Sequence, residues 1–177
     1  MKHLSIVGAG NNRAVADFYP TPDFATEQLL WREKFEGTIW ECASGDGAIA
    51  KFFPNCMASD LRTDDSIYGE KGIDFLKTYR KVDNIITNPP YKYAQEFVEQ
   101  ALFCADKKVA MLLKLVFLES ISRKKLFDKN QLRVVYVFRR RLKIYANGIM
   151  GKNSGLIAYA WFIWDKSYNG KPTIDWI

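Results

Sequence analysis

The feature that most constrains the fold is a rigid polar turn at the end of a largely apolar run. Asn88-Pro89-Pro90-Tyr91 follows residues 83–87, which predict a buried strand. Two consecutive prolines fix φ and remove two N–H donors, and the first also holds Asn88 in an extended conformation. In an open α/β sheet, ligands bind at the edge where the parallel strands end. We therefore expect the turn to lie at that edge.

The same turn offers acceptors to an amine. The Asn88 side-chain oxygen and a bare backbone carbonyl both accept hydrogen bonds, and Tyr91 adds an aromatic face. An amine on an aromatic ring is a poor nucleophile because its lone pair is delocalised. Two acceptors that hold its hydrogens favour a pyramidal nitrogen, which can attack a sulfonium methyl group. Asn88, Pro89, Pro90 and Tyr91 thus predict a catalytic turn, with an ordinary strand-ending turn as the alternative.

A second ligand-binding pattern lies upstream. Residues 38–43 read as a strand, Ser44-Gly45-Asp46-Gly47 as a glycine-rich turn, and residues 48–53 as a helix. The spacing differs from the dinucleotide and P-loop fingerprints. Glu41, at the strand end, suits a ligand with a cationic amine. Asp60 closes the next apolar stretch 19 residues later, where a carboxylate commonly binds ribose hydroxyls.

A third strand end is expected at Asp74-Phe75. There Asp74 can supply an acceptor for an adenine amino group, and Phe75 a ring edge beside it. Each acid alone could be a solvated loop residue. Three strand ends in register with the turn after residue 87 favour a shared ligand site.

With these motifs the chain resembles the S-adenosylmethionine-dependent amino-methyltransferases, specifically the N6-adenine DNA methyltransferases of phage and prophage type. The resemblance covers nearly the whole chain, and Cys42 stands where the family frequently has proline. The segments that carry it are residues 17–22, 40–47, Asp60, Asp74-Phe75, residues 88–91, residues 117–119 with Arg123, and residues 159–165.

The resemblance implies S-adenosylmethionine as the cofactor and transfer of its methyl group to the N6 amine of a flipped adenine in DNA. It implies that Tyr19, Pro20, Thr21 and Glu41 contact the methionine part of the cofactor. The full set of implied cofactor residues is Tyr19, Pro20, Thr21, Glu41, Ala43, Gly45, Gly47, Asp60, Asp74, Phe75 and Asn88. A cytoplasmic location in a bacterial host is also implied.

The apolar pattern predicts a single α/β domain. Strands are expected near residues 38–43, 56–60, 73–75, 83–88, 109–117, 132–138 and 156–164, with helices near 26–34, 94–104 and 119–127. This alternation favours a doubly wound, mostly parallel, seven-stranded sheet of the Rossmann-like methyltransferase fold, with the last strand antiparallel. The length of 177 residues suits one domain. We expect a mobile arm at residues 1–16 and a domain at 17–177, without a separate target-recognition domain.

Charge is unevenly distributed along the chain. Residues 1–106 carry 11 Lys/Arg against 16 Asp/Glu, a net of −5, whereas residues 107–177 carry 15 against 4, a net of +11. The basic half contains a run that suits a loop gripping phosphates around an extruded base. The expected nucleic-acid contacts are Arg139, Arg140, Arg141, Lys143 and Tyr145. Residues 123–125 are a second basic cluster, for which a solvated surface is the alternative.

Other functional classes receive less support. His3 is the single histidine and the three cysteines lack metal-ligand spacing, so we expect no metal and reduced, buried thiols. No apolar run approaches the roughly 20 residues of a membrane span. The remaining alternatives are methylation of RNA adenine, of cytosine N4 or of a protein glutamine, and a cofactor- or DNA-binding subunit that needs a partner chain. A homodimer also stays open.

Overall fold

A computed structural model describes residues 18–129, 131–145 and 157–177. The arm expected at residues 1–16 lies outside these ranges, as does Asp17 of the N-terminal motif. The described strands are β1 (Ile39–Glu41), β2 (Cys56–Asp60), β3 (Glu70–Lys71), β4 (Val82–Thr87), β5 (Ala105–Lys114), β6 (Leu132–Val137), β7 (Tyr159–Asp165) and β8 (Thr173–Trp176). The helices are α1 (Asp23–Arg32), α2 (Ala94–Cys104) and α3 (Ile121–Lys129), with 3-10 turns η1 (Ala50–Phe52), η2 (Phe75–Lys77), η3 (Tyr91–Tyr93) and η4 (Leu115–Leu118).

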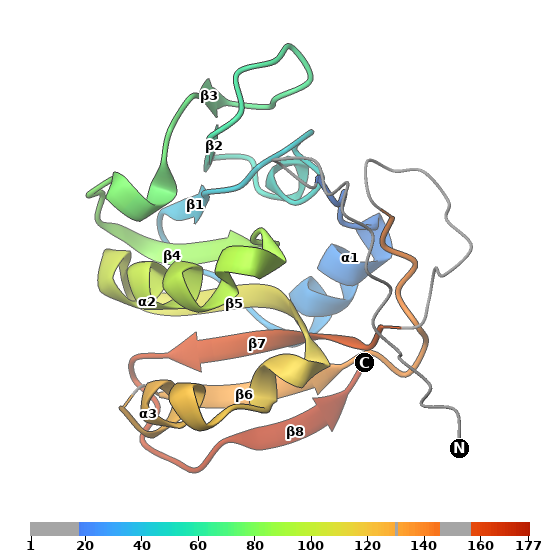
Figure 1. The fold of residues 1–177 in the computed structure, drawn as a ribbon, viewed down its shortest axis with the longest axis vertical. Coiled ribbons are helices and arrows are strands. Elements are labelled where there is room, and N and C mark those ends of the chain that lie inside the picture. Colours follow the sequence, from blue (N-terminus) through green and yellow to red (C-terminus); the bar gives the residue numbers. More distant parts are fainter. Residues whose placement is uncertain (1–17, 130, 146–156) are drawn as a thin grey trace, which may run out of the picture.

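The described strands form one sheet in the order β3-β2-β1-β4-β5-β7-β6-β8 (Figure 1). β7 runs antiparallel to both of its neighbours, β5 and β6, and the other pairings are parallel. The expected α/β fold with a mostly parallel sheet and an antiparallel β7 is confirmed. Because β4 and β6 run the same way, the turn at residues 88–91 and the basic run leave the sheet at the same edge.

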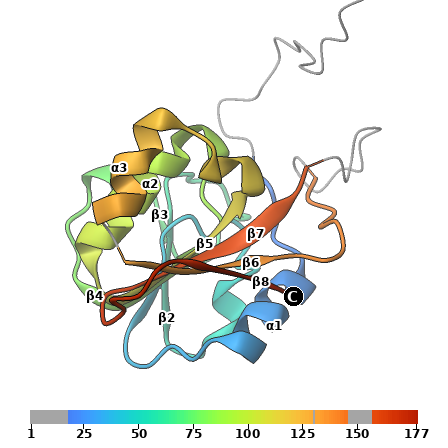
Figure 2. The same ribbon diagram turned by 90° about the horizontal axis from the view of Figure 1, so that it is seen from below.

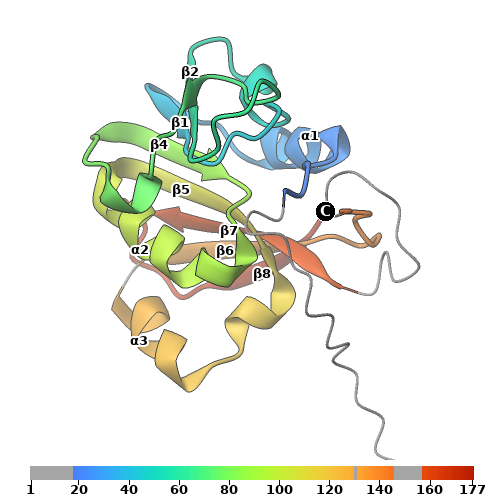
Figure 3. The same ribbon diagram turned by 45° about the horizontal axis from the view of Figure 1, so that its top comes forward.

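Helices cover both faces of the sheet (Figure 2). On one face lie α2 and α3, and α2 contacts β4 and β5 (Figure 3). This side contains a core in which Phe97 and Val98 of α2 meet Ile85 and Phe162. On the other face, α1 contributes Leu29 to a second core with Leu112 and Trp161. The two cores hold the central strands rigidly, so their ends are fixed points for a site.

Three local predictions were wrong. The third strand is Glu70–Lys71 rather than residues 73–75, because Phe75 begins η2 and its ring packs in the core. The helix expected at residues 48–53 is a series of turns ending in η1. An eighth strand, β8, extends the sheet beside β6, whereas seven strands were expected.

Candidate active site

The turn after β4 leads directly into η3 and α2. All peptide bonds of the described chain are trans, and the Tyr93 N–H donates to the Pro90 carbonyl at 2.9 Å. Pro89 is buried, whereas Pro90 is exposed. The double proline thus forms a short connection from the buried strand to α2, with Asn88 at its start.

The side chain of Asn88 is held by the N-terminal segment. Its Nδ2 donates to the carbonyl oxygen of Tyr19 at 3.0 Å and to Oγ1 of Thr21 at 3.1 Å. A carbonyl can only accept, so these bonds fix which end of the amide is the nitrogen. Asn88 Oδ1 is buried and has no hydrogen-bond partner among the described residues. An acceptor of known orientation is therefore left unsatisfied at the end of β4.

Tyr91 lies in an aromatic cluster. Its ring centroid is 5.6 Å from that of Tyr19 and 5.5 Å from that of Tyr159, both tilted, and Lys114 Nζ lies 4.8 Å from it. Its hydroxyl is buried and makes no hydrogen bond of good geometry within the described chain. Burial, and then the neighbouring Tyr159, raise the pKa of Tyr91 well above its ordinary value. Tyr91 therefore stays neutral, and its ring is fixed from several sides.

The glycine-rich turn follows β1 closely. Gly45 and Gly47 have φ values of 53° and 81°, which side chains rarely adopt. A Cβ at Gly45 would collide with the ring of Phe18, and one at Gly47 with the ring of Tyr68. Both positions thus require glycine, for conformation and for the close approach of an aromatic ring.

Two of the predicted acids support this turn. Asp60, at the end of β2, accepts from the Gly45 N–H through Oδ2 and from the Arg62 N–H through Oδ1, both at 2.8 Å. Glu41, at the end of β1, is buried and accepts from the Ala50 N–H at 2.6 Å. Burial raises the pKa of Glu41 well above its ordinary value, although the Ala50 hydrogen bond opposes this. Ala43, between them in the chain, is half-buried.

At the third expected strand end, Asp74 is partly exposed whereas Phe75 lies in the core. Asp74 caps η2 by accepting from the Leu76 N–H at 3.1 Å, and it pairs with Lys77 at 3.0 Å. The Phe75 ring is 2% exposed and lies 5.1 Å from Trp40 and 5.0 Å from Phe97. The ring edge expected beside Asp74 is therefore part of the core.

One segment joins the turn at residues 88–91 to the glycine-rich turn. Phe18 packs on Gly45, and the next residue, Tyr19, binds Asn88 through its carbonyl. Pro20 then leads to Thr21 and the start of α1. The guanidinium of Arg62 lies 5.0 Å from the Phe18 ring. Sequence reasoning did not assign Phe18, Arg62 or Tyr68 to the site; Phe18 alone had a signal, its place beside Tyr19 in the N-terminal motif.

The basic run follows β6. Arg139, Arg140, Arg141 and Lys143 are exposed, while Leu142 and Ile144 are buried in the α1-side core and Tyr145 is half-buried. The Arg139 N–H donates to the carbonyl of Ile177 at 2.8 Å. The segment is thus anchored by two apolar side chains and presents three cations before them and one between them. Asn153 and Ser154 beyond it lie outside the described residues.

Three further features of the described residues concern the length of the helices, the metal-binding side chains and the cysteines. No helix in the described ranges is long and apolar enough to cross a membrane. Within the same ranges, no group of three or more His, Cys, Asp or Glu side chains could hold a metal ion. Cys42, Cys56 and Cys104 are free thiols; Cys42 and Cys104 are buried and Cys56 is half-buried.

No protein-family model and no curated protein sequence matches the chain. Solved structures do. A candidate RNA methyltransferase from Pyrococcus horikoshii has a TM-score of 0.63 at 16% identity, over 88% of this chain and 90% of that one. A candidate class I S-adenosylmethionine-dependent methyltransferase from Listeria monocytogenes has a TM-score of 0.61 at 14% identity, over 89% and 65%.

A modification subunit of a candidate type I restriction enzyme from Vibrio vulnificus YJ016 has a TM-score of 0.60 at 13% identity, over 91% of this chain. The match spans 47% of that subunit, about half of its length. At these identities the likeness is one of architecture. The chain therefore has the Rossmann-like α/β fold of these three structures.

Proposed function

We propose that the protein transfers a methyl group from S-adenosylmethionine to the N6 amine of adenine in DNA. The unsatisfied Oδ1 of Asn88 carries this proposal. A buried acceptor without a partner costs about 1–3 kcal/mol, which a bound N–H donor offsets. Because Tyr19 and Thr21 hold the other end of the amide, the acceptor is preorganised before a substrate arrives.

The second acceptor of the turn is assigned to the Pro89 carbonyl. The Pro90 carbonyl already accepts from the Tyr93 N–H, and neither proline has an N–H to compete for the ligand. Two acceptors on one amine orient its lone pair away from the ring system, which raises its nucleophilicity. Neutral Tyr91 then supports the flat base by stacking.

The residues present fit S-adenosylmethionine. Carboxylates at the ends of β1 and β2, Glu41 and Asp60, suit the ammonium and the ribose hydroxyls. Glu41 is buried with a raised pKa, and a cationic amine beside it favours its ionised form. When bound, the cofactor supplies an electrophilic sulfonium methyl group. Asp74 and the backbone of Phe75 are assigned to its adenine.

DNA as the substrate is supported by charge. The run at residues 139–143 presents four exposed cations at the sheet edge where Asn88 lies. Phosphate contacts of this kind supply much of the affinity for nucleic acid, largely without regard to sequence. Flipping brings a base from the duplex to the turn.

RNA adenine is the second candidate. The Pyrococcus horikoshii neighbour, whose match covers about nine-tenths of each of the two chains, is named as a candidate RNA methyltransferase. Cytosine N4 and protein glutamine share the amine chemistry but receive no separate support from the site. A subunit that acts only with a partner chain is the non-enzymatic alternative.

Nucleoside mass spectrometry tests the proposal. The purified protein is incubated with methyl-labelled S-adenosylmethionine and, separately, with DNA, RNA and a glutamine-containing peptide. Label in N6-methyladenine from DNA is the expected result. Label found only in RNA, in N4-methylcytosine or in the peptide would contradict adenine in DNA as the substrate and identify the alternative. No label in any sample would favour a subunit that needs a partner chain.

A further inference from the structure

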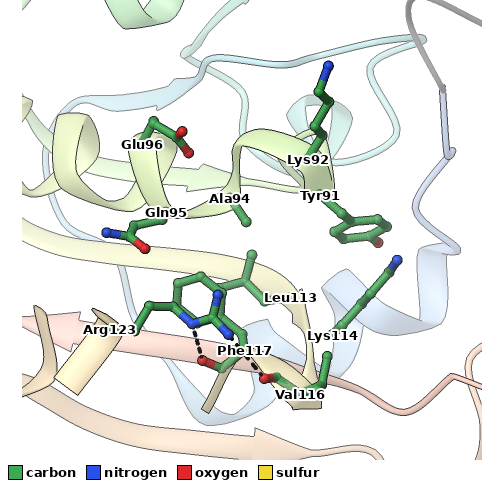
Figure 4. A pocket seen from close by; sticks show the side chains of 10 residues that line it. All are labelled: Tyr91, Lys92, Ala94, Gln95, Glu96, Leu113, Lys114, Val116, Phe117 and Arg123. Atoms are coloured by element: carbon green, nitrogen blue, oxygen red, sulfur yellow. Dashed lines mark hydrogen bonds between the residues drawn. The ribbon is translucent and has the colours of Figure 1, made fainter. Parts of the chain in front are cut away.

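A cavity of about 280 Å³ lies beside the catalytic turn, between the start of α2, the end of β5 and α3 (Figure 4). Tyr91 is part of its lining, but Asn88, Tyr19 and Thr21 are not. The cavity therefore adjoins the amine-binding acceptor through Tyr91 without containing it. A group bound there would be an immediate neighbour of the target base.

The walls of this cavity suit a flat, largely apolar group. Leu113 and Phe117 are buried side chains in its lining, and the Tyr91 ring closes one side. Aromatic and aliphatic walls of this kind accept the faces of any nucleobase. The lining also contains one carboxylate, Glu96, and three cations, Lys92, Lys114 and Arg123.

Gln95 adds a hydrogen-bonding group of fixed direction. Its Nε2 donates to Oε1 of Glu99, one turn further along α2, at 3.0 Å. A carboxylate only accepts, so the amide nitrogen must face Glu99. Figure 4 shows the Gln95 oxygen on the side of the cavity. The cavity thus presents an acceptor to an N–H donor on its ligand.

Arg123 is held in the wall of the cavity by backbone carbonyls. Its Nε donates to the Phe117 carbonyl at 2.8 Å, another of its nitrogens donates to the Glu119 carbonyl, and its guanidinium lies 4.7 Å from the Phe117 ring. These bonds tie α3 to η4 through Nε and one terminal nitrogen of the guanidinium. Lys114, whose Nζ lies 4.8 Å from the centre of the Tyr91 ring, adjoins both the cavity and the turn.

We infer that this cavity binds the nucleobase that flanks the target adenine in the substrate strand, with Gln95 selecting a base that offers an N–H donor. The inference rests on the proposed function. It gives a single domain a way to favour one sequence context, since the flanking base is read next to the site of transfer.

The test uses oligonucleotides with one adenine and either a base or an abasic residue on its 5′ or 3′ side. The parent and the Gln95→Ala and Gln28→Ala variants are compared; Gln28 lies on α1, on the opposite face of the sheet. Methyl transfer is followed as kcat/KM, and affinity as the Kd from fluorescence anisotropy, which does not require turnover.

For the parent, an abasic residue on one side should lower kcat/KM and affinity by on the order of 10-fold, as removal of a stacked base does. Gln95→Ala should reduce the preference among the four flanking bases, and Gln28→Ala should match the parent. Equal kcat/KM and Kd for every flank would overturn the inference while leaving adenine methylation standing. A uniform loss in Gln95→Ala, independent of the flank, would overturn it by placing the target base in the cavity. Absence of methylation with flank-dependent Kd would contradict only the proposed reaction.

Discussion

The side-chain nitrogen of Asn88 donates to the backbone carbonyl of Tyr19, 69 residues earlier, at 3.0 Å. This bond connects the turn assigned to chemistry with the segment assigned to the cofactor. Phe18, the preceding residue, packs on Gly45. A shift of the N-terminal segment would therefore move the contacts of both the glycine-rich turn and Asn88. The orientation of the Asn88 acceptor thus depends on residues far from it in the chain.

Thr21 provides the second bond to Asn88 and can be tested separately from the backbone. Thr21→Val keeps the shape of the side chain and removes Oγ1, so the amide should be less firmly oriented. We expect kcat to fall about fivefold, equivalent to about 1 kcal/mol for one hydrogen bond. Thr21→Ser retains the hydroxyl and should remain close to the parent. Equal kcat for Thr21→Val and the parent in a methyl-transfer assay would show that this bond has no role in the reaction.

Replacing Glu41 by glutamine should stabilise the folded protein at pH 7 and weaken its binding of S-adenosylmethionine. Burial raises its pKa in the folded state, so its contribution to stability is complete below the unfolded value of about 4.3 and is lost as pH rises through the folded value. Glu41→Gln removes this loss and can still accept from the Ala50 N–H. The variant should melt at a higher temperature than the parent at pH 7, with the difference disappearing toward pH 4.

The same variant should bind S-adenosylmethionine more weakly, because a neutral amide replaces the carboxylate facing the ammonium. Calorimetric melting across pH and titration with the cofactor measure the two effects. A variant that is less stable than the parent at pH 7 would contradict the proposed cost of burying the charge.

Asp60 has both a structural and a binding role. Asp60→Ala should weaken S-adenosylmethionine binding by about 1.5–3 kcal/mol, the usual loss for a charged hydrogen-bonding group. It should also loosen the glycine turn, since the Gly45 and Arg62 N–H groups lose their acceptor. Asp60→Asn keeps one acceptor oxygen, so its affinity for S-adenosylmethionine should lie between those of the parent and Asp60→Ala. Equal cofactor affinity for parent and Asp60→Ala in calorimetry would remove Asp60 from the binding site.

The basic run can be tested through salt dependence. Replacing Arg139, Arg140 and Arg141 by glutamine should weaken DNA binding and lower the slope of log K against log salt by roughly 0.9 for each phosphate that is no longer neutralised. Affinity for S-adenosylmethionine should hold. Neutralising Lys124 and Lys125, both exposed on α3, provides the comparison. An unchanged slope in the arginine variant, with a reduced slope in the lysine variant, would move the DNA-binding surface to α3.

The main elements were predictable because strong periodicity coincides with burial. The helix expected at residues 94–104 is α2, with Phe97 and Val98 facing the core. The apolar run that predicted the fifth strand belongs to β5, at the centre of the sheet. The antiparallel pairing of β6 and β7 followed from the lack of a helical pattern between them.

The weaker elements carry little apolar pattern. β3 consists of Glu70 and Lys71, both exposed, so only its pairing with β2 makes it a strand. β8 has exposed Ile174 and Trp176 at the edge of the sheet, and burial therefore gave no signal for it. The Phe75 ring is expected beside a ligand because Asp74-Phe75 reads as a strand end, whereas the ring packs against Trp40 from β1. Packing between segments distant in sequence decided each of these cases.

In the candidate site too, some features could be predicted from the sequence and others depend on tertiary packing. Its polar residues could be located by motif, and Asn88, Asp60 and Glu41 each lie at a strand end. The bonds between them could not, since Tyr19 reaches Asn88 through its backbone carbonyl, which is present in every residue type. The flanking cavity also depends on side chains from five elements, η3, α2, β5, η4 and α3, which are brought together by tertiary packing.

The most direct test of the central claim is the product formed by Asn88→Ala. The parent and the variant are incubated with DNA and methyl-labelled S-adenosylmethionine, and the nucleosides are separated by mass spectrometry, with cofactor affinity measured in parallel. We expect labelled N6-methyladenine from the parent, none from the variant, and nearly equal affinity for the cofactor. Substantial formation of N6-methyladenine by Asn88→Ala would contradict the role of the turn, and labelling of a different nucleoside by the parent would contradict the proposed substrate.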